Sequence, residues 1–134
     1  MKVVEYLIAS ILLVIIDGVW LSVVAKNIFD IQIKRIQKTE MKLKLTPAVL
    51  AYIFLVFGIN YFIIKPHKSP LDAAYLGWII YFVFDFTNLA IFEKYAWITA
   101  FIDGVWGGVL FWLTTTITYL IIKFVKKRFI PLKI

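Results

Sequence analysis

Three aspartates inside apolar segments are the residues whose type and placement could do chemistry. The pentapeptide Ile-Asp-Gly-Val-Trp occurs twice, at residues 16–20 and 102–106, and places Asp17 and Asp103 in long apolar segments. Asp85 lies in a third apolar segment. A carboxylate at the centre of a bilayer costs about 2.5 to 3.5 kcal/mol on insertion scales, so such groups should face one another or a wet cavity. An ionisable residue placed there is a functional candidate by default.

The positions of the acids predict a common depth. Counted from the expected ends of their segments at about 1.5 Å per residue, all three carboxyls lie roughly 10 to 12 Å from one membrane surface. Carboxylates this close cannot all ionise, so we expect at least one to carry a proton at neutral pH. The cluster could exchange protons, bind a cation or hydrogen-bond a polar substrate. Alternatively, the acids only join helices by hydrogen bonds.

Other polar and aromatic residues should surround these acids. Tyr81, Asp85 and Asn88 share one helical face. Trp20 and Trp106 each follow an acid by three residues and could wall the pocket or donate an indole N–H, although ordinary packing tryptophans are an equal alternative. The candidate ion- or proton-binding set is Asp17, Asp85, Asp103, Asn88 and Thr87, and the candidate pocket wall is Trp20, Trp106 and Tyr81.

The glycines predict close helix packing. Gly104 and Gly108 form a GxxxG pattern that contains Gly107, and Gly18 begins a weaker small-residue pair with Ser22. We expect these glycines at a contact between the first and last spans. Those spans run antiparallel, so the repeated pentapeptides predict a local two-fold pseudosymmetry, as in transporters with inverted repeats.

The composition predicts the elements that hold these residues. The chain has 134 residues, 63% of them apolar, and its mean hydropathy is strongly positive, which indicates an integral, multi-pass membrane protein. We expect one domain, 1–134, of the all-α class: an antiparallel bundle of four transmembrane helices. Their expected spans are about 6–25, 46–64, 71–92 and 96–122.

The basic residues lie between and beyond the spans. The connection 26–44 is either a basic amphipathic helix at the headgroups or a helical extension of the first span, and residues 123–134 form a basic tail. The net charge of +7 favours anionic lipid headgroups as partners and not nucleic acid. Eight basic residues on one side against seven on the other leave the orientation open.

Several chemistries find no support in the sequence. The chain has no cysteine, and its one histidine, His67, lies between lysines in a short turn. Phosphate-binding and nucleophile motifs are missing from the sequence. We therefore expect no metal, cofactor or catalytic residue.

The motifs around the acids carry a resemblance to a known family. Residues 17–21 read Asp-Gly-Val-Trp-Leu, residues 84–90 read Phe-Asp-Phe-Thr-Asn-Leu-Ala, and residues 103–107 read Asp-Gly-Val-Trp-Gly. In this combination the chain resembles a family of predicted membrane proteins, domain of unknown function 2177. The resemblance implies a four-helix, multi-pass protein and no activity. Phe84 departs from the family pattern, which has tyrosine there.

These observations favour a small proton- or cation-coupled transporter or channel, with a homo-oligomer as the expected assembly. The alternative is a non-catalytic membrane scaffold or assembly subunit whose acids are hydrogen-bonding groups between helices. An enzyme acting on a lipid is the least favoured, because no nucleophile or metal ligands accompany the acids.

Overall fold

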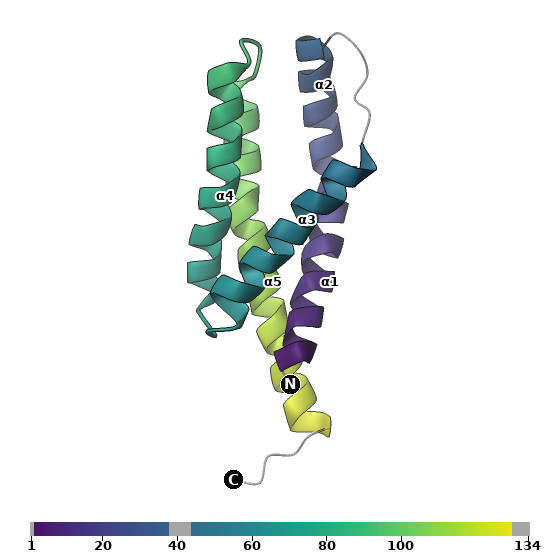
Figure 1. Cartoon of the computed structure of the whole chain (residues 1–134), viewed down its shortest axis with the longest axis vertical. Helices are drawn as coiled ribbons and strands as arrows, with labels where there is room; N and C mark the ends of the chain where they lie inside the picture. Colours follow the sequence, from purple (N-terminus) through teal and green to yellow (C-terminus); the bar gives the residue numbers. More distant parts are fainter. Residues whose placement is uncertain (1, 38–43, 130–134) are drawn as a thin grey trace.

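The computed structural model describes residues 2–37 and 44–129, which form helices joined by short turns (Figure 1). The elements are α1 (Lys2–Trp20), the π-helix η1 (Leu21–Ala25), α2 (Lys26–Gln37), α3 (Leu45–Ile59), the π-helix η2 (Asn60–Ile64), α4 (Pro70–Ile91) and α5 (Trp97–Phe129). They provide four helices long and apolar enough to cross a membrane: Lys2–Gln37, Leu45–Ile64, Pro70–Ile91 and Trp97–Arg128. The predicted all-α polytopic bundle with four spans is confirmed.

The helices α4 and α5 form a tightly packed antiparallel hairpin. Ser69 starts α4 by accepting a hydrogen bond from the Asp72 amide, and Pro70 occupies the first turn, where no N–H is needed. Gly77 of α4 lies against the backbone carbonyl of Gly107 and has no room for a Cβ atom, and a Cβ on Gly107 would collide with the Tyr81 side chain. This close approach aligns the two helices that carry Asp85 and Asp103.

The expected partner of the glycines was wrong. Gly104, Gly107 and Gly108 pack under Phe82, Tyr81 and Trp78 of α4, and not against the first span. A hairpin closed by a few residues keeps its helices together along their length, so the glycines serve that contact. In the described part of the chain, no atom of another element lies within 4 Å of the position that a Cβ on Gly18 would take, so Gly18 does not mediate packing between these helices.

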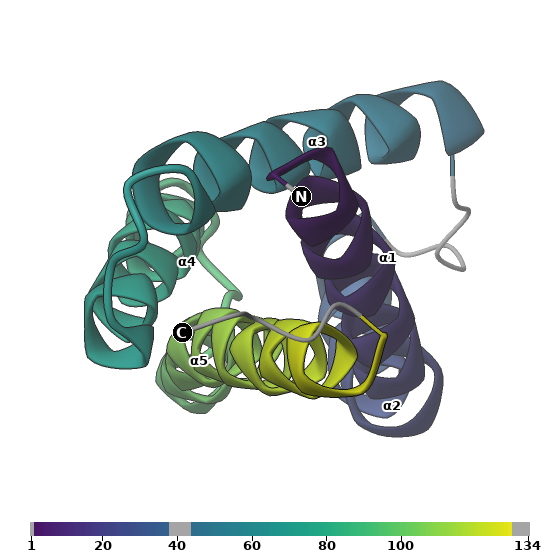
Figure 2. The same ribbon diagram turned by 90° about the horizontal axis from the view of Figure 1, so that it is seen from below.

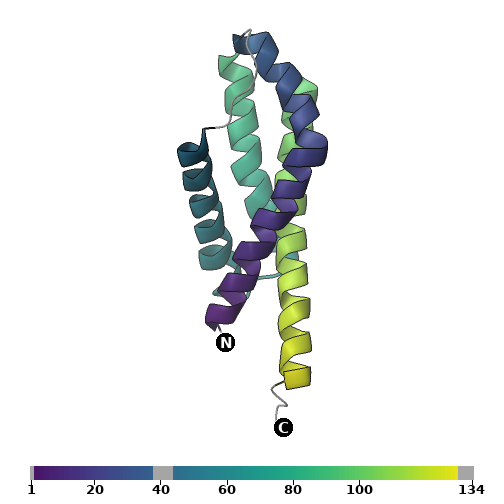
Figure 3. The ribbon, with the colours of Figure 1, turned by 90° about the vertical axis from the view of Figure 1, so that its right-hand side faces the viewer.

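The first helix runs antiparallel to α5 and continues far beyond the predicted end of its span. Ala9 and Leu13 of α1 are fully buried in the core with Leu110 of α5. After η1 the helix continues as α2 to Gln37, alongside the upper part of the hairpin (Figures 1 and 3). The start of the connection 26–44 is thus a helical extension of α1, and residues 38–43 lie outside the described part.

The third span, α3 with η2, crosses the others obliquely. Seen from below, it packs beside α1 and reaches α4 only near the turn that joins them (Figure 2). Two polar contacts tie it to α1: Asn60 donates to Ser10 at 3.0 Å, and Tyr52 donates to Asp17. One flank of α4 is left uncovered as a result.

The C-terminal end of α5 extends past the other helices (Figure 3). The Tyr119 hydroxyl donates to the carbonyl of Lys68 at 2.6 Å, which sets the level of the turn before α4. The basic tail predicted at 123–134 therefore begins as the last turns of α5, through Phe129, and residues 130–134 lie outside the described part.

Candidate functional site

The three aspartates are buried but do not form one layer. Asp85 is fully buried, Asp17 is 5% exposed and Asp103 is 7% exposed. Asp85 and Asp103 face each other across the α4–α5 hairpin, with their carboxyls within hydrogen-bonding reach. Asp17 meets different partners, so the structure contains a pair and a separate single acid.

The predicted common depth was wrong for Asp17 because the end of the first helix was misplaced. Gln32, and not Ala25, lies level with the α4–α5 loop, where it contacts the backbone of Lys94 and Ala96. Asp17 precedes Gln32 by 15 residues, about 22 Å of helix, whereas Asp85 and Asp103 lie about 10 Å from the loop. The single acid is therefore deeper from this end of the bundle.

The Asp17 carboxylate is held by two donors from two other helices. The Tyr52 hydroxyl of α3 donates to Oδ2, and the Trp106 indole N–H of α5 donates to Oδ1 at 2.9 Å. Both oxygens are thereby satisfied, and Asp17 links α1, α3 and α5. Trp106 thus caps the acid of the opposite pentapeptide and not Asp103, its neighbour in sequence.

The two pentapeptides meet, but their contacts are not symmetric. The rings of Trp20 and Trp106 stack at 4.5 Å between centroids with an interplanar angle of 6°. Trp106 reaches Asp17, but the equivalent Trp20 Nε1 is buried without a hydrogen-bond partner in the described part of the chain. Asp103 is instead paired with Asp85, so the two sequence copies have different surroundings.

The Asp85–Asp103 pair lacks the donors that surround Asp17. Asp85 Oδ1 accepts a hydrogen bond from the Tyr95 hydroxyl at 2.8 Å. Its Oδ2 atom is buried and contacts no donor among the described residues. Two carboxylates repel each other and have no hydrogen to share, so this contact is favourable only when one of them carries a proton.

Tyr95 covers the pair at the loop end. Its side chain is 6% exposed and lies between α4 and α5. Burial and the hydrogen bond to Asp85 raise the pKa of the Tyr95 hydroxyl above its usual range. The hydroxyl therefore stays protonated and available as a donor to Asp85 at neutral pH.

Tyr81 lies between the two acidic sites. Its ring packs on Gly107, and its hydroxyl is within electrostatic reach of all three aspartates and of Tyr52. The pocket-wall roles of Tyr81, Trp20 and Trp106 stay predictions. Trp20 and Trp106 also line an apolar groove between α1 and α5 with Phe101, Ile102, Val105 and Val109.

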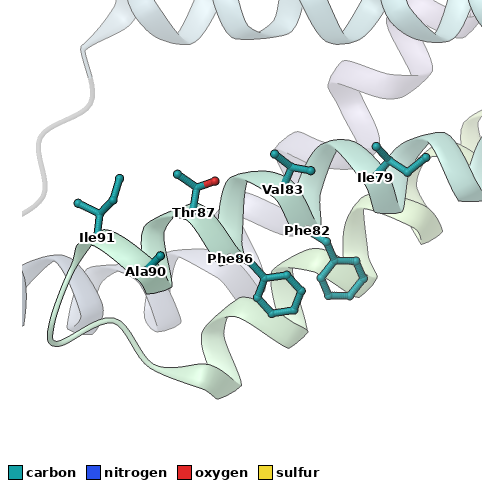
Figure 4. Close-up of a pocket in the computed structure, with 7 residues that line it drawn as sticks. All are labelled: Ile79, Phe82, Val83, Phe86, Thr87, Ala90 and Ile91. Carbon is teal, nitrogen blue, oxygen red and sulfur yellow. The ribbon is translucent and has the colours of Figure 1, made fainter.

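The two remaining predicted site residues lie apart from each other. Asn88 is close enough to Tyr95 to hydrogen-bond its hydroxyl, so it belongs to the loop end of the pair. Thr87 is exposed on the outer face of α4, where it lines an apolar surface groove with Phe86 and Val83 (Figure 4). The expectation that Thr87 supports the acids was wrong, because its position on the helix points it away from α5.

Three residues of these sites were not predicted: Tyr52, Tyr95 and Gln32. Gln32 carried a signal, since it lies on the same helical face as the apolar Phe29, Ile33 and Ile36. Among residues 2–37 and 44–129, no group of three His, Cys, Asp or Glu side chains could hold a metal ion.

Comparison with known proteins places these motifs in a family. The model of a family described as predicted membrane proteins, DUF2177, matches residues 2–120. The chain belongs to the DUF2177 family. The matched range contains both pentapeptides and every residue of the two acidic sites of this DUF2177 protein. No curated protein and no solved structure matches the chain.

Proposed function

We propose that this protein is a proton-coupled membrane transporter or proton channel in which the Asp85–Asp103 pair holds the exchangeable proton. The observation that carries the proposal is the contact between these two carboxyls, one of them with a buried oxygen that no donor from residues 2–37 and 44–129 reaches. A proton shared between them satisfies that oxygen, and its release would leave two facing charges. Such a pair binds a proton reversibly as its surroundings change.

A series of protonatable side chains leads away from the pair in both directions. Tyr95 contacts Asp85 on the loop side. Tyr81 lies on the other side of the pair, with its hydroxyl within electrostatic reach of Asp85 and Asp103. A hydroxyl both donates and accepts, so these two tyrosines can pass a proton to and from the pair. Asp17, whose oxygens already accept from Tyr52 and Trp106, lies outside this path.

A proton suits this site better than a metal cation. A bound cation needs several oxygen ligands, usually with water. Here no group of three acidic or histidine side chains among the described residues could hold a metal ion, and both Asp17 oxygens already accept from Tyr52 and Trp106. We therefore favour proton exchange over cation binding, and the homo-oligomer stays a prediction.

Proton flux into liposomes tests the proposal. The full chain is reconstituted with a pH-sensitive dye inside, and a potassium gradient with valinomycin drives proton entry. We expect wild-type flux above that of empty liposomes, Asp103→Asn at the empty-liposome level, and Asp72→Asn unchanged, because Asp72 is exposed at the start of α4. Equal flux in wild type and Asp103→Asn would overturn the proposal.

The scaffold alternative draws on a different observation, the complete satisfaction of Asp17 by two helices. An acid held in this way acts as a tie between spans. If the whole protein is a scaffold, substitutions at the pair should change stability alone, and the liposomes should show no flux in any variant.

A further inference from the structure

A buried amide of α2 holds the α4–α5 loop. Gln32 of α2 is 2% exposed. Its Nε2 donates to the carbonyl of Lys94 at 2.6 Å, and its Oε1 accepts from the amide of Ala96 at 2.7 Å. Thr99 adds a weaker contact to the same oxygen at 3.4 Å. A carbonyl on one side and an N–H on the other fix the orientation of the amide.

The two backbone groups that Gln32 holds flank Tyr95. Fixing residues 94 and 96 therefore fixes the residue between them, whose hydroxyl donates to Asp85. Gln32 touches neither acid, so it acts on the pair only through the position of Tyr95. With Gln32 in place, Tyr95 and the loop separate the pair from the solvent at this end.

The helix that carries Gln32 has a built-in point of bending. Residues Leu21–Ala25 form a π-helix, with the Lys26 amide bonded to the carbonyl of Leu21, five residues back. Such widened turns mark functional positions in helices. The Ser22 hydroxyl also donates to the carbonyl of Gly18 at 2.8 Å, a bond that favours bending.

The two sides of this turn are held to different degrees. Below it, α1 is fixed by the Asp17–Trp106 hydrogen bond and by the stacked tryptophans. Above it, α2 meets the loop through Gln32, while its ion pair, Lys34–Asp30, joins residues of α2 to each other. A bend at η1 would therefore move α2 and leave the Asp17 site intact.

We propose that Gln32 is a latch at the loop end of the bundle, and that its release, by bending at Leu21–Ala25, opens the Asp85–Asp103 pair to water. Gln32 is a positioning residue in this mechanism. The role of the latch in controlling access to the pair rests on the proposed proton exchange. The opening of the latch can be measured without that assumption.

Thiol labelling tests the latch directly, because the chain has no cysteine. Ala100 is fully buried one helical turn beyond Ala96, so Ala100→Cys introduces one reporter thiol behind the loop. A membrane-impermeant thiol reagent is added to both sides of liposomes containing the full chain. We expect Gln32→Ala to raise the labelling rate about tenfold, the effect of losing two hydrogen bonds on an opening equilibrium.

The matched control is Asn27→Ala, which removes an exposed amide from the same helix. It should leave the rate unchanged, and equal rates in Gln32→Ala and Asn27→Ala would overturn the latch. If Gln32→Ala does not fold, Gln32→Glu replaces it. Glutamate keeps the size but turns a carboxylate oxygen toward the Lys94 carbonyl and buries a charge, so a rate increase at least as large is expected, and no increase overturns the proposal.

Amide hydrogen exchange tests the bending at Leu21–Ala25 separately from the release of Gln32. In Gln32→Ala we expect faster exchange of the amides in α2 and η1, with no change in α1. Faster thiol labelling without faster exchange in α2 and η1 would overturn the proposed bending at Leu21–Ala25. Labelling that depends on Gln32 in a protein without proton flux would support the latch and reject the proton role.

Discussion

The two acidic sites contain the same residue type in neighbouring parts of one bundle, yet their carboxyls have different hydrogen-bond partners. Asp17 has a donor for each oxygen, one from α3 and one from α5. Asp85 has a donor for one oxygen and another carboxyl beside it. Asp17 and Asp103 even share the pentapeptide Ile-Asp-Gly-Val-Trp. The difference comes from the neighbouring helix, because α3 offers a tyrosine and α4 offers a second acid.

If the proposed function is right, this contrast separates the site that contributes stability from the site that exchanges a proton. A satisfied carboxylate gains nothing from a proton and loses hydrogen bonds when replaced. A carboxyl pair needs a proton, and its contact survives in any variant that supplies an equivalent hydrogen. The two sites should therefore respond to the same substitution in opposite ways.

The largest expected effect comes from separating α4 from α5. A Cβ at Gly77 would collide with the carbonyl of Gly107 and crowd Phe111. We expect Gly77→Ala to lower the free energy of unfolding by about 1 to 3 kcal/mol, as overpacking does, and to abolish proton exchange by displacing the pair. Chemical unfolding in detergent measures the first effect and liposome flux the second.

Gly58→Ala is the control for this prediction, since a Cβ there meets nothing within 4 Å. Replacement of glycine by alanine in a helix then stabilises by roughly 0.5 to 1 kcal/mol. Equal effects of the two substitutions would remove the close packing of α4 and α5 as the basis of the pair.

A smaller effect distinguishes the two sites directly. Asparagine at Asp17 keeps one acceptor for two donors, so we expect Asp17→Asn to cost about 0.6 to 1.7 kcal/mol, the range for hydrogen bonds between spans. Flux should persist. Asparagine at Asp85 can accept from Tyr95 and donate to Asp103, so Asp85→Asn should change stability by less than about 0.5 kcal/mol and eliminate flux.

Both variants are unfolded in detergent and assayed for liposome flux. The expected result is that Asp17→Asn loses stability and keeps flux, whereas Asp85→Asn keeps stability and loses flux. If both variants lose stability and keep flux, the pair is a structural contact like Asp17. If Asp17→Asn alone loses flux, the sites have been assigned the wrong way round.

The smallest effect concerns Tyr95 and alkaline pH. Burial and the Asp85 hydrogen bond raise the pKa of Tyr95 in the folded state above the ordinary value of about 10. The stability that this shift contributes is fully present below pH ~10 and is lost as the pH rises above it. We expect the melting temperature to fall less steeply above pH ~10 in Tyr95→Phe than in wild type. Identical slopes would place the Tyr95 hydroxyl outside the pair.

The architecture could be predicted from the sequence, because four apolar segments of spanning length leave few alternatives. The burial of Asp17, Asp85 and Asp103 followed from the cost of acids in lipid. Their grouping could not be predicted, because it depends on where the first helix ends. Ala25 ends the apolar run, but Gln32, seven residues later, meets the loop. The apolar face that Gln32 shares with Phe29, Ile33 and Ile36 predicts a helix here, but the same pattern fits an amphipathic helix at the headgroups as well as an extension of the first span.

The hydrogen-bond partners of the acids could not be predicted from the sequence either. Tyr52 and Tyr95 look like ordinary aromatic residues of a membrane protein until α3 and the loop bring their hydroxyls to carboxylates. Thr87 follows Asp85 by two residues and therefore lies on another face of α4. Its closeness to Asp85 in the sequence does not bring the two side chains together.

The infrared absorption of a protonated carboxyl tests the central claim most directly. The reconstituted protein at neutral pH should show this band, which shifts in heavy water because the proton exchanges. We predict that the band disappears in both Asp85→Asn and Asp103→Asn and is unchanged in Asp17→Asn. A band that is absent from wild type, or that disappears only in Asp17→Asn, would contradict a proton shared by the α4–α5 pair.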